Sequence, residues 1–251
     1  MLSHLKSQLR ALPLIFPCLR KVRRTFCPNQ YDLWQINSQR FVDFLRRTTE
    51  SATKPVFVKV GANDGVSGDP CGRIFIDNPK WTGILIEPVP YLVAKLVENY
   101  VDRARFNVEQ VAIGNEPGKT QFFYVDESAK LALPDLPGHY DMLGSFNRQH
   151  IANHLNGVLE PYIVAVEIEV QTLAAVLDRN CIKRIDVLQV DTEGYDWEVL
   201  KSLDLDTIRP KAIYIEHKHL TPDDRHSMVT RMTSTGYRVH DCGNDFFAET
   251  K

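Results

Sequence analysis

The chain has 251 residues, a formal net charge of −2 and 43% apolar residues. This length and composition are typical of a globular protein with a sizeable core, in one large domain or two small ones. The small net charge excludes a whole-protein electrostatic attraction to nucleic acid or anionic membranes, so any charged partner must be recognised locally.

Cysteines and apolar runs indicate the cellular context. The five cysteines form no C-x-x-C pair, and an odd number suits neither a disulfide framework nor a zinc site. The apolar run at 11–19 is shorter than the roughly 20 residues of a membrane span and is interrupted by prolines. It is followed by RKVRR, where a signal peptide has small residues. We expect a cytoplasmic protein with no integral membrane segment and no nucleic-acid partner.

A basic N-terminal extension is predicted over residues 1–37, because residues 1–30 contain Lys and Arg but no acidic residue. Such an arm can dock on phospholipid or on an anionic substrate, but single basic tracts are more often simply solvated. From Ser38, a residue type common at helix starts, Phe41 and Leu45 recur on one helical face. We therefore predict a helix there, and the main domain over 38–251.

Strand and helix signals then alternate along the chain. Short apolar runs predict strands, and apolar residues at helical spacing, with prolines near two helix starts, predict helices. The predicted strands are 55–60, 82–87, 106–113, 120–125, 162–170, 185–190, 211–216, 237–240 and 246–249. The predicted helices are 88–100, 172–180, 195–203 and one that begins at Thr221. This alternation predicts an α/β fold, with helices on both faces of a largely parallel sheet.

Residues 126–161 contain several Pro, Gly and His residues and are predicted to form an irregular lid or substrate loop. Substrate contacts concentrate in loops held over a rigid sheet, although exposed polar loops can also be merely soluble. Ser145 and His154 are the candidate substrate-binding residues of this segment.

Ligands of parallel sheets bind at the carboxyl ends of the strands, near the point where the strand order reverses. The strand at 55–60 runs into GANDG at 61–65, where glycines allow the backbone to approach a ligand closely. Glu87 ends the next strand, where a carboxylate can accept both hydroxyl hydrogens of a ribose, or can simply precede the next helix. Val111 and Ala112 lie where they could pack on a base, and a core role is equally compatible.

Acidic and imidazole side chains follow two later strands. Asp191 and Glu193 follow one, and Glu216, His217 and His219 follow the next. Carboxylates in such positions need a cation, a donor or solvent. The group could hold a divalent cation or supply a general base, and Glu193 could equally cap the following helix. We favour Asp191 as the functional acid and assign no metal ligand.

Five segments between about 55 and 217 carry a family resemblance. They are VFVKVGANDG, WTGILIEPVPYLVAKLVENY, VAIGNEPGKTQFFYV, VQTLAAVLDRNCIKRIDVLQVDTEGYDWEVLKSL and RPKAIYIEH. In this order, and especially through D-x-E-G and E-P, the set resembles the FkbM family of S-adenosylmethionine-dependent methyltransferases. The resemblance implies a Rossmann-like class I methyltransferase domain with a seven-stranded sheet, and O-methylation of a hydroxyl on a glycan or on a small-molecule secondary metabolite. It implies S-adenosylmethionine as the cofactor, with a divalent metal compatible but not favoured.

Carried onto this chain, the resemblance also implies roles for single residues. Glu87 would bind the ribose of the cofactor, and Asp191 and Glu193 would face the reacting centre. The methionine part of the cofactor would be lined by Gly61, Asn63, Asp64 and Gly65. Such families commonly have an acid two residues before the first glycine, where this chain has Lys59, and Asp64 could compensate.

A proton must leave the acceptor hydroxyl, and we expect Asp191 or His217 to receive it. Glu216 and His219 lie at the same level and are further candidate substrate-binding residues. The sequence does not indicate the acceptor, the oligomeric state or the role of the arm.

Two other functions are compatible with the sequence. A nicotinamide-dependent oxidoreductase shares the fold, but Tyr91 and Lys95 of its Y-x-x-x-K pattern come too early in the chain, and G-x-G-x-x-G is missing. A non-catalytic methyltransferase-like binding module is favoured by Lys59 and opposed by acids at three strand ends. Binding of S-adenosylmethionine discriminates between these functions.

Overall fold

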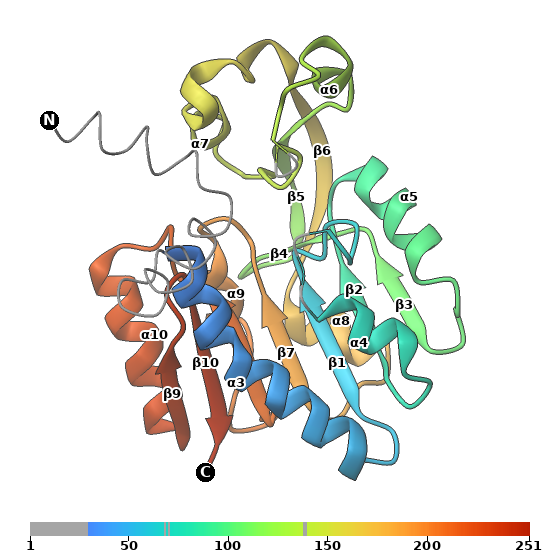
Figure 1. The fold of residues 1–251 in the computed structure, drawn as a ribbon, viewed down its shortest axis with the longest axis vertical. Coiled ribbons are helices and arrows are strands. Elements are labelled where there is room, and N and C mark those ends of the chain that lie inside the picture. The colour runs from blue at the N-terminus through green and yellow to red at the C-terminus, as the bar shows by residue number, and fades with distance from the viewer. Residues whose placement is uncertain (1–29, 68, 70, 138–139) are drawn as a thin grey trace, which may run out of the picture.

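The structure is a computed structural model that describes residues 30–67, 69, 71–137 and 140–251 (Figure 1). Residues 1–29 of the basic extension predicted over 1–37, with its cysteines and the apolar run at 11–19, lie outside the described residues. Within the described ranges, no helix is long and apolar enough to cross a membrane.

A seven-stranded sheet forms the centre of the fold. Its order is β3 (Phe106–Glu109), β2 (Thr82–Ile86), β1 (Val56–Val60), β7 (Val187–Val190), β8 (Ala212–Glu216), β10 (Asp245–Thr250) and β9 (Tyr237–Asp241). β10 runs antiparallel to β8 and β9, and the remaining neighbours pair in parallel. The predicted α/β fold with a largely parallel seven-stranded sheet is confirmed, and the strand order reverses between β1 and β7, where a ligand site is expected.

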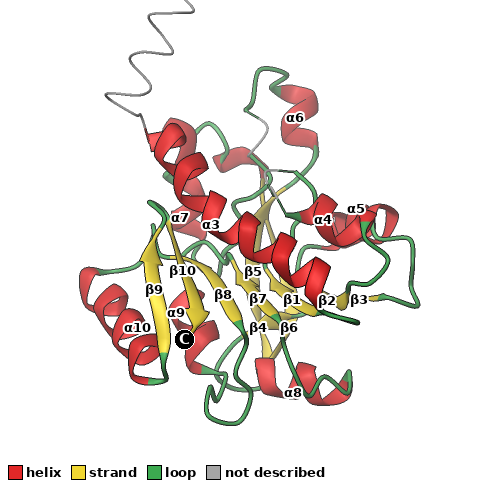
Figure 2. Ribbon diagram, turned by 60° about the horizontal axis from the view of Figure 1, so that its bottom comes forward, coloured by secondary structure: helices red, strands yellow, loops and turns green. Residues whose placement is uncertain are grey.

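Helices cover both faces of this sheet (Figure 2). One face packs on α3 (Gln30–Ser51), α4 (Gly72–Asp77) and α5 (Pro90–Asn99) through a mainly aromatic core that includes Phe57, Phe75 and Trp81. The other face packs on α8 (Leu173–Arg179), α9 (Asp196–Lys201) and α10 (Pro222–Ser234) through an aliphatic core. Successive strand residues such as Phe57 and Val58 serve opposite cores, as the two-residue period of a strand requires.

Two predicted elements differ from the structure. Helix α3 begins at Gln30, so Ser38 lies inside the helix and is not its cap. No proline or glycine interrupts 30–51, and a serine's preference for the cap position is worth only about 1 kcal/mol. The single strand predicted over 106–113 is two strands in the structure. Its first part is β3 of the main sheet, and its last part, β4 (Ala112–Ile113), belongs to a second sheet.

The second sheet carries a small lobe above the main sheet (Figure 1). It consists of β4, β5 (Gly118–Val125) and β6 (Ile163–Gln171), and β5 and β6 form a long antiparallel pair. The segment between them folds into α6 (Ser128–Ala132), α7 (Arg148–Ala152), η1 (His154–Gly157) and η2 (Glu160–Tyr162) around its own apolar cluster. Helices of five residues or fewer show little periodicity, so the sequence pattern appears irregular. A lid role for this lobe stays a prediction.

Candidate functional site

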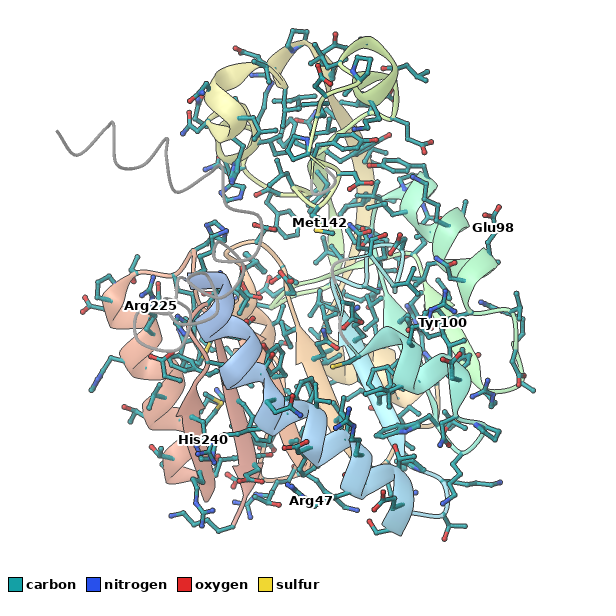
Figure 3. All side chains as sticks on the ribbon, in the orientation of Figure 1. Arg47, Glu98, Tyr100, Met142, Arg225 and His240 are labelled. Atoms are coloured by element: carbon teal, nitrogen blue, oxygen red, sulfur yellow. The ribbon has the colours of Figure 1, made fainter. Side chains whose placement is uncertain are left out.

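A cavity of about 280 Å³ opens at the carboxyl ends of β1, β2, β7 and β8. Met142, from the lobe, lines its upper side (Figure 3). Among the described residues that line the cavity, the acids outnumber the cations, and Lys59 is the only lysine or arginine. The acids are Asp69, Glu87, Asp141, Asp191, Glu193, Glu216 and Asp245. Such a lining favours a ligand that carries positive charge.

Glu87 lies in the cavity wall directly after β2 and is 5% exposed. One carboxylate oxygen accepts a hydrogen bond from the Asn63 backbone N–H at 2.8 Å, and the other accepts from the Val89 N–H at 3.0 Å. Burial raises the pKa of Glu87 to about 7, although both N–H donors favour the ionised form. Its free lone pairs remain available to donors of a ligand, as the ribose prediction requires.

The turn after β1 is shaped mainly by neighbouring backbone. Gly61 has φ +72°, and a Cβ on it would lie 1.7 Å from the Asp191 carbonyl oxygen. The Gly61 and Ala62 N–H groups both donate to the Ile86 carbonyl at 3.0 Å. Gly61 is therefore needed for the close approach of β1 and β7, and its backbone and Asn63 also line the cavity.

Asp64 and Gly65, to which the resemblance assigns a place beside the methionine part of the cofactor, do not line the cavity. The Asp64 carboxylate accepts hydrogen bonds from the Val66 N–H and from the N–H and hydroxyl of Ser67. Gly65 has φ +78°, and a Cβ there would lie 2.4 Å from the Tyr100 ring. Both residues therefore stabilise the turn, and compensation for Lys59 by Asp64 stays a prediction.

Lys59 has its own acidic partner. Its ammonium group lies 2.6 Å from the Asp69 carboxylate, and both side chains are 5% exposed. The other Asp69 oxygen accepts from the Cys71 N–H at 2.8 Å. The charge that is unusual in the sequence is therefore neutralised locally by a buried ion pair in the cavity wall.

Three acids meet where β7, β8 and β10 reach the cavity. Solvent reaches Asp191 through the cavity, but the surrounding protein and the charge of Glu193 raise the pKa of Asp191 well above its usual range. Glu216 is 8% exposed, and burial together with the charge of Asp191 raises its pKa. Asp245 accepts a hydrogen bond from the Tyr214 hydroxyl at 3.0 Å. This side of the cavity can hold a proton or balance a cationic ligand.

His217 does not line the cavity, although we expected it as an alternative base. Its ring is stacked on Phe246 with 3.9 Å between centroids, and neither ring nitrogen has a hydrogen-bond partner among the described residues. Burial lowers the pKa of His217. Since Tyr214 and Glu216 both face the cavity, the next residue faces the other side of the strand.

Glu193 and His219 do meet, at a second cavity of about 230 Å³ beside the first. The His219 Nε2 lies 3.1 Å from a Glu193 oxygen, and the Nε2 of His150, from α7, lies 3.7 Å from the same oxygen. Ser145 lines this cavity, and its hydroxyl accepts from the Asn147 N–H at 3.1 Å. His154 lies next to His150 but uses its Nδ1 on the His150 carbonyl at 2.7 Å.

The turn that carries Glu193 is held by a residue that sequence reasoning missed. Asp196 is fully buried, and its carboxylate accepts hydrogen bonds from the Thr192 N–H at 2.8 Å and the Gly194 N–H at 3.1 Å. Burial raises the pKa of Asp196 to about 6. Glu193 itself has φ +52°, a conformation that L residues rarely adopt. Burial raises the pKa of Glu193, but His150 and His219 outweigh this and lower it to about 2.

The remaining candidates lie in the cavity wall or at the contact of α5 with the lobe. Val111 and Ala112 are buried and line the large cavity, next to Leu92 and Phe122. An apolar wall of this kind can hold an aromatic base. The Tyr91 hydroxyl instead donates to the Val125 carbonyl and Lys95 pairs with Glu127, so the Y-x-x-x-K pattern connects α5 to the lobe.

The sequence of the chain matches a model of the methyltransferase FkbM domain over residues 59–239. Among curated proteins, none matches this chain.

Three solved structures illustrate what the fold is similar to. An FkbM methyltransferase from Methylobacillus flagellatus is 15% identical, with 78% of this chain and 44% of that one covered and a TM-score of 0.49. The pre-rRNA processing protein fibrillarin of Methanococcus jannaschii is 11% identical, with 79% and 68% covered and a TM-score of 0.39. An O-methyltransferase from Bacillus cereus, in complex with SAH, is 9% identical, with 92% and 96% covered and a TM-score of 0.40. The first comparison thus spans less than half of the other protein, and similarities this remote give no information about substrate.

Proposed function

Since this chain belongs to the methyltransferase FkbM domain family, we propose that it is an S-adenosylmethionine-dependent O-methyltransferase that acts on a hydroxyl of a small molecule or glycan. The observation that carries the proposal is Glu87, a buried carboxylate in the cavity wall whose two oxygens are positioned by backbone N–H groups of two different turns. A neutral side chain would accept the two hydroxyl hydrogens of a ribose less well.

The described residues fit this cofactor in three respects. Glu87 would hold the ribose, and the apolar wall at Val111 and Ala112 would hold the adenine. The excess of acids over cations matches a ligand with a sulfonium and an ammonium group. When bound, S-adenosylmethionine supplies a methyl group made electrophilic by its positively charged sulfur.

The chain's own part in the reaction is to bind the acceptor, to exclude water and to receive the proton that an alcohol loses. Asp191 is the residue that we propose to receive this proton, because it lies at the end of β7 inside the cavity, whereas His217 lies outside it. Glu216 faces the same region from β8 and would orient the acceptor hydroxyl. Asp191→Asn should keep cofactor affinity within about threefold and should lower turnover by about 100-fold or more. Unchanged turnover would remove Asp191 from this role.

Calorimetric titration with S-adenosylmethionine, S-adenosylhomocysteine and NAD tests the cofactor. Glu87→Gln should lower the affinity for adenosyl ligands by about 10-fold to 100-fold, which is the loss expected when hydrogen bonds to a charged group are removed. Glu98→Gln is the matched control, because Glu98 is exposed on α5 and lies outside the cavity (Figure 3). A folded protein that binds no adenosyl ligand would support the non-catalytic module, and NAD binding would support the oxidoreductase.

The cysteines and the acids of the cavity support two further parts of the proposal, the cellular compartment and the class of acceptor. The cysteines among the described residues, Cys71, Cys181 and Cys242, form no disulfide, which suits a reducing compartment such as the cytoplasm. The acid-rich cavity opposes a nucleic-acid acceptor, so we expect a small molecule or glycan.

A further inference from the structure

Three side chains from distant parts of the chain converge at the second cavity. His150 comes from α7 in the lobe, Glu193 from the turn after β7, and His219 from the segment after β8. One nitrogen of each imidazole and one carboxylate oxygen lie within 4.8 Å of one another. The two histidine nitrogens are both nearest the same Glu193 oxygen, at 3.7 Å and 3.1 Å.

The three converging atoms lack hydrogen-bond partners among the described residues. His150 Nε2, Glu193 Oε2 and His219 Nε2 are each inaccessible to solvent, make no hydrogen bond and approach only one another, and the hydroxyl of Thr192 beside them is also without a hydrogen-bond partner in the described part of the chain. The side chains are only 17–19% exposed. A buried polar atom without a partner costs about 1–3 kcal/mol, so three in one place indicate that something binds between them.

A simple ion pair accounts for this arrangement less well than a bound cation does. Although His219 lies within hydrogen-bond distance of Glu193, its orientation makes no hydrogen bond. The backbone of Glu193 is held at φ +52°, and conformations of this kind cost about 1–3 kcal/mol and persist mainly at functional sites. The buried Asp196 carboxylate, which binds the N–H groups on either side of Glu193, keeps the turn in this conformation.

We propose that His150, Glu193 and His219 form a binding site for a divalent transition-metal ion, for which Zn²⁺ is the probe. Two imidazoles and one carboxylate suit zinc and other first-row metals, whereas calcium and magnesium prefer oxygen ligands alone. Donor atoms on a tetrahedral zinc ion lie about 3.4 Å apart, so the widest separation in the triangle, at most 4.8 Å, has to contract by up to about 1.4 Å. His154 is not among the groups whose donor atoms converge here, and its Nδ1 bonds the His150 carbonyl.

The position of this site suggests what the ion does. Three protein ligands leave coordination positions open, and the cavity of about 230 Å³ gives room there for water or a substrate oxygen. Phe146, Thr192, Glu193 and Tyr195 line both cavities, so the ion lies at the edge of the cofactor cavity. The following role rests on the proposed function. The ion would bind the acceptor hydroxyl and lower the pKa of that hydroxyl, so that Asp191 receives the proton more readily.

Metal binding can be measured without any enzyme assay. Untagged, EDTA-treated protein is titrated with Zn²⁺ by calorimetry, and the bound zinc is counted by elemental analysis after dialysis. We expect one ion per chain, with His150→Gln and His219→Gln each weakening the affinity by at least about 10-fold. His226→Gln, on the exposed surface of α10, is the matched control and should keep wild-type affinity.

The Co²⁺-loaded protein provides a second measurement that does not depend on how the variants fold. Its visible absorption should show a low-symmetry site with nitrogen and oxygen ligands, and the spectrum should change when an acceptor alcohol is added. Failure of the wild type to bind zinc, or wild-type affinity in both folded ligand variants, would overturn the metal site. Titration of the same samples with S-adenosylmethionine reports separately on the proposed function, so one failure is not mistaken for the other.

Discussion

Adenosyl ligands should bind this protein more tightly as the pH rises from about 6 to about 8, because an ionised Glu87 accepts both ribose hydrogens better than a protonated one does. Burial raises the pKa of Glu87 to about 7, above its usual value of 4.5. Two hydroxyl donors from a ribose would favour the charged form further, so binding lowers this pKa and releases a proton.

The size of the effect follows from the pKa. With a value near 7, about a tenth of the unliganded protein carries ionised Glu87 at pH 6, and about nine tenths carries it at pH 8. The apparent affinity scales with this competent fraction, so it should rise by about tenfold, or about 1.4 kcal/mol.

Stability of the unliganded protein should change in the opposite direction. The pKa of Glu87 is higher in the folded protein than in the unfolded chain, so the folded state holds the proton more tightly between these two values. The stabilising contribution of protonated Glu87 is complete below about pH 4.5 and is lost as the pH rises through 7. The loss amounts to about 3 kcal/mol.

The assay is calorimetric titration with 5′-methylthioadenosine, which has the ribose but no amino-acid group that titrates in this range. Buffers of different ionisation enthalpy count the protons released. Glu87→Gln should abolish both the pH dependence and the proton release, whereas Glu98→Gln should keep them. A wild-type affinity that does not change with pH, or a slope that survives in Glu87→Gln, would refute the reasoning.

Three further predictions concern the frame of the site, and each is checked by urea unfolding. Gly61→Ala should lower the free energy of unfolding by at least about 3 kcal/mol, because Gly61 has a positive φ and the added Cβ would overlap the Asp191 carbonyl. The control is Gly118→Ala, whose Cβ would have no atom within 4 Å, and it should change the free energy of unfolding by less than about 1 kcal/mol. Lys59→Met should cost about 3–5 kcal/mol, because it leaves the buried carboxylate of Asp69 unpaired. Breaking an exposed pair, such as that of Lys183 with Asp178, should leave the free energy of unfolding close to that of the wild type. Asp196→Ala should cost about 1–3 kcal/mol for each N–H group left without an acceptor and should also weaken zinc binding, whereas stability equal to wild type would mean that water replaces the carboxylate.

Strand ends and their acids could be predicted from the sequence, because the information is local. A short apolar run followed by a polar turn indicates where a buried strand stops, and in a parallel sheet such ends lie along one edge. Glu87, Asp191 and Glu216 were expected at that edge, and all three line the cavity. The period of two along a strand could also have excluded His217, since it follows Glu216 directly.

Only the tertiary structure shows which polar side chains meet and which side chain occupies the space left by a glycine. Gly65 makes room for the Tyr100 ring, which depends on packing across the chain, whereas the hydrogen bonds of Asp64 to Val66 and Ser67 are local to its turn. His150, Glu193 and His219 share no local pattern, because the lobe that carries His150 is placed by a second sheet. Local sequence determined where the strands end, but distances between side chains far apart in the chain are set by packing, and this placed the candidate metal site.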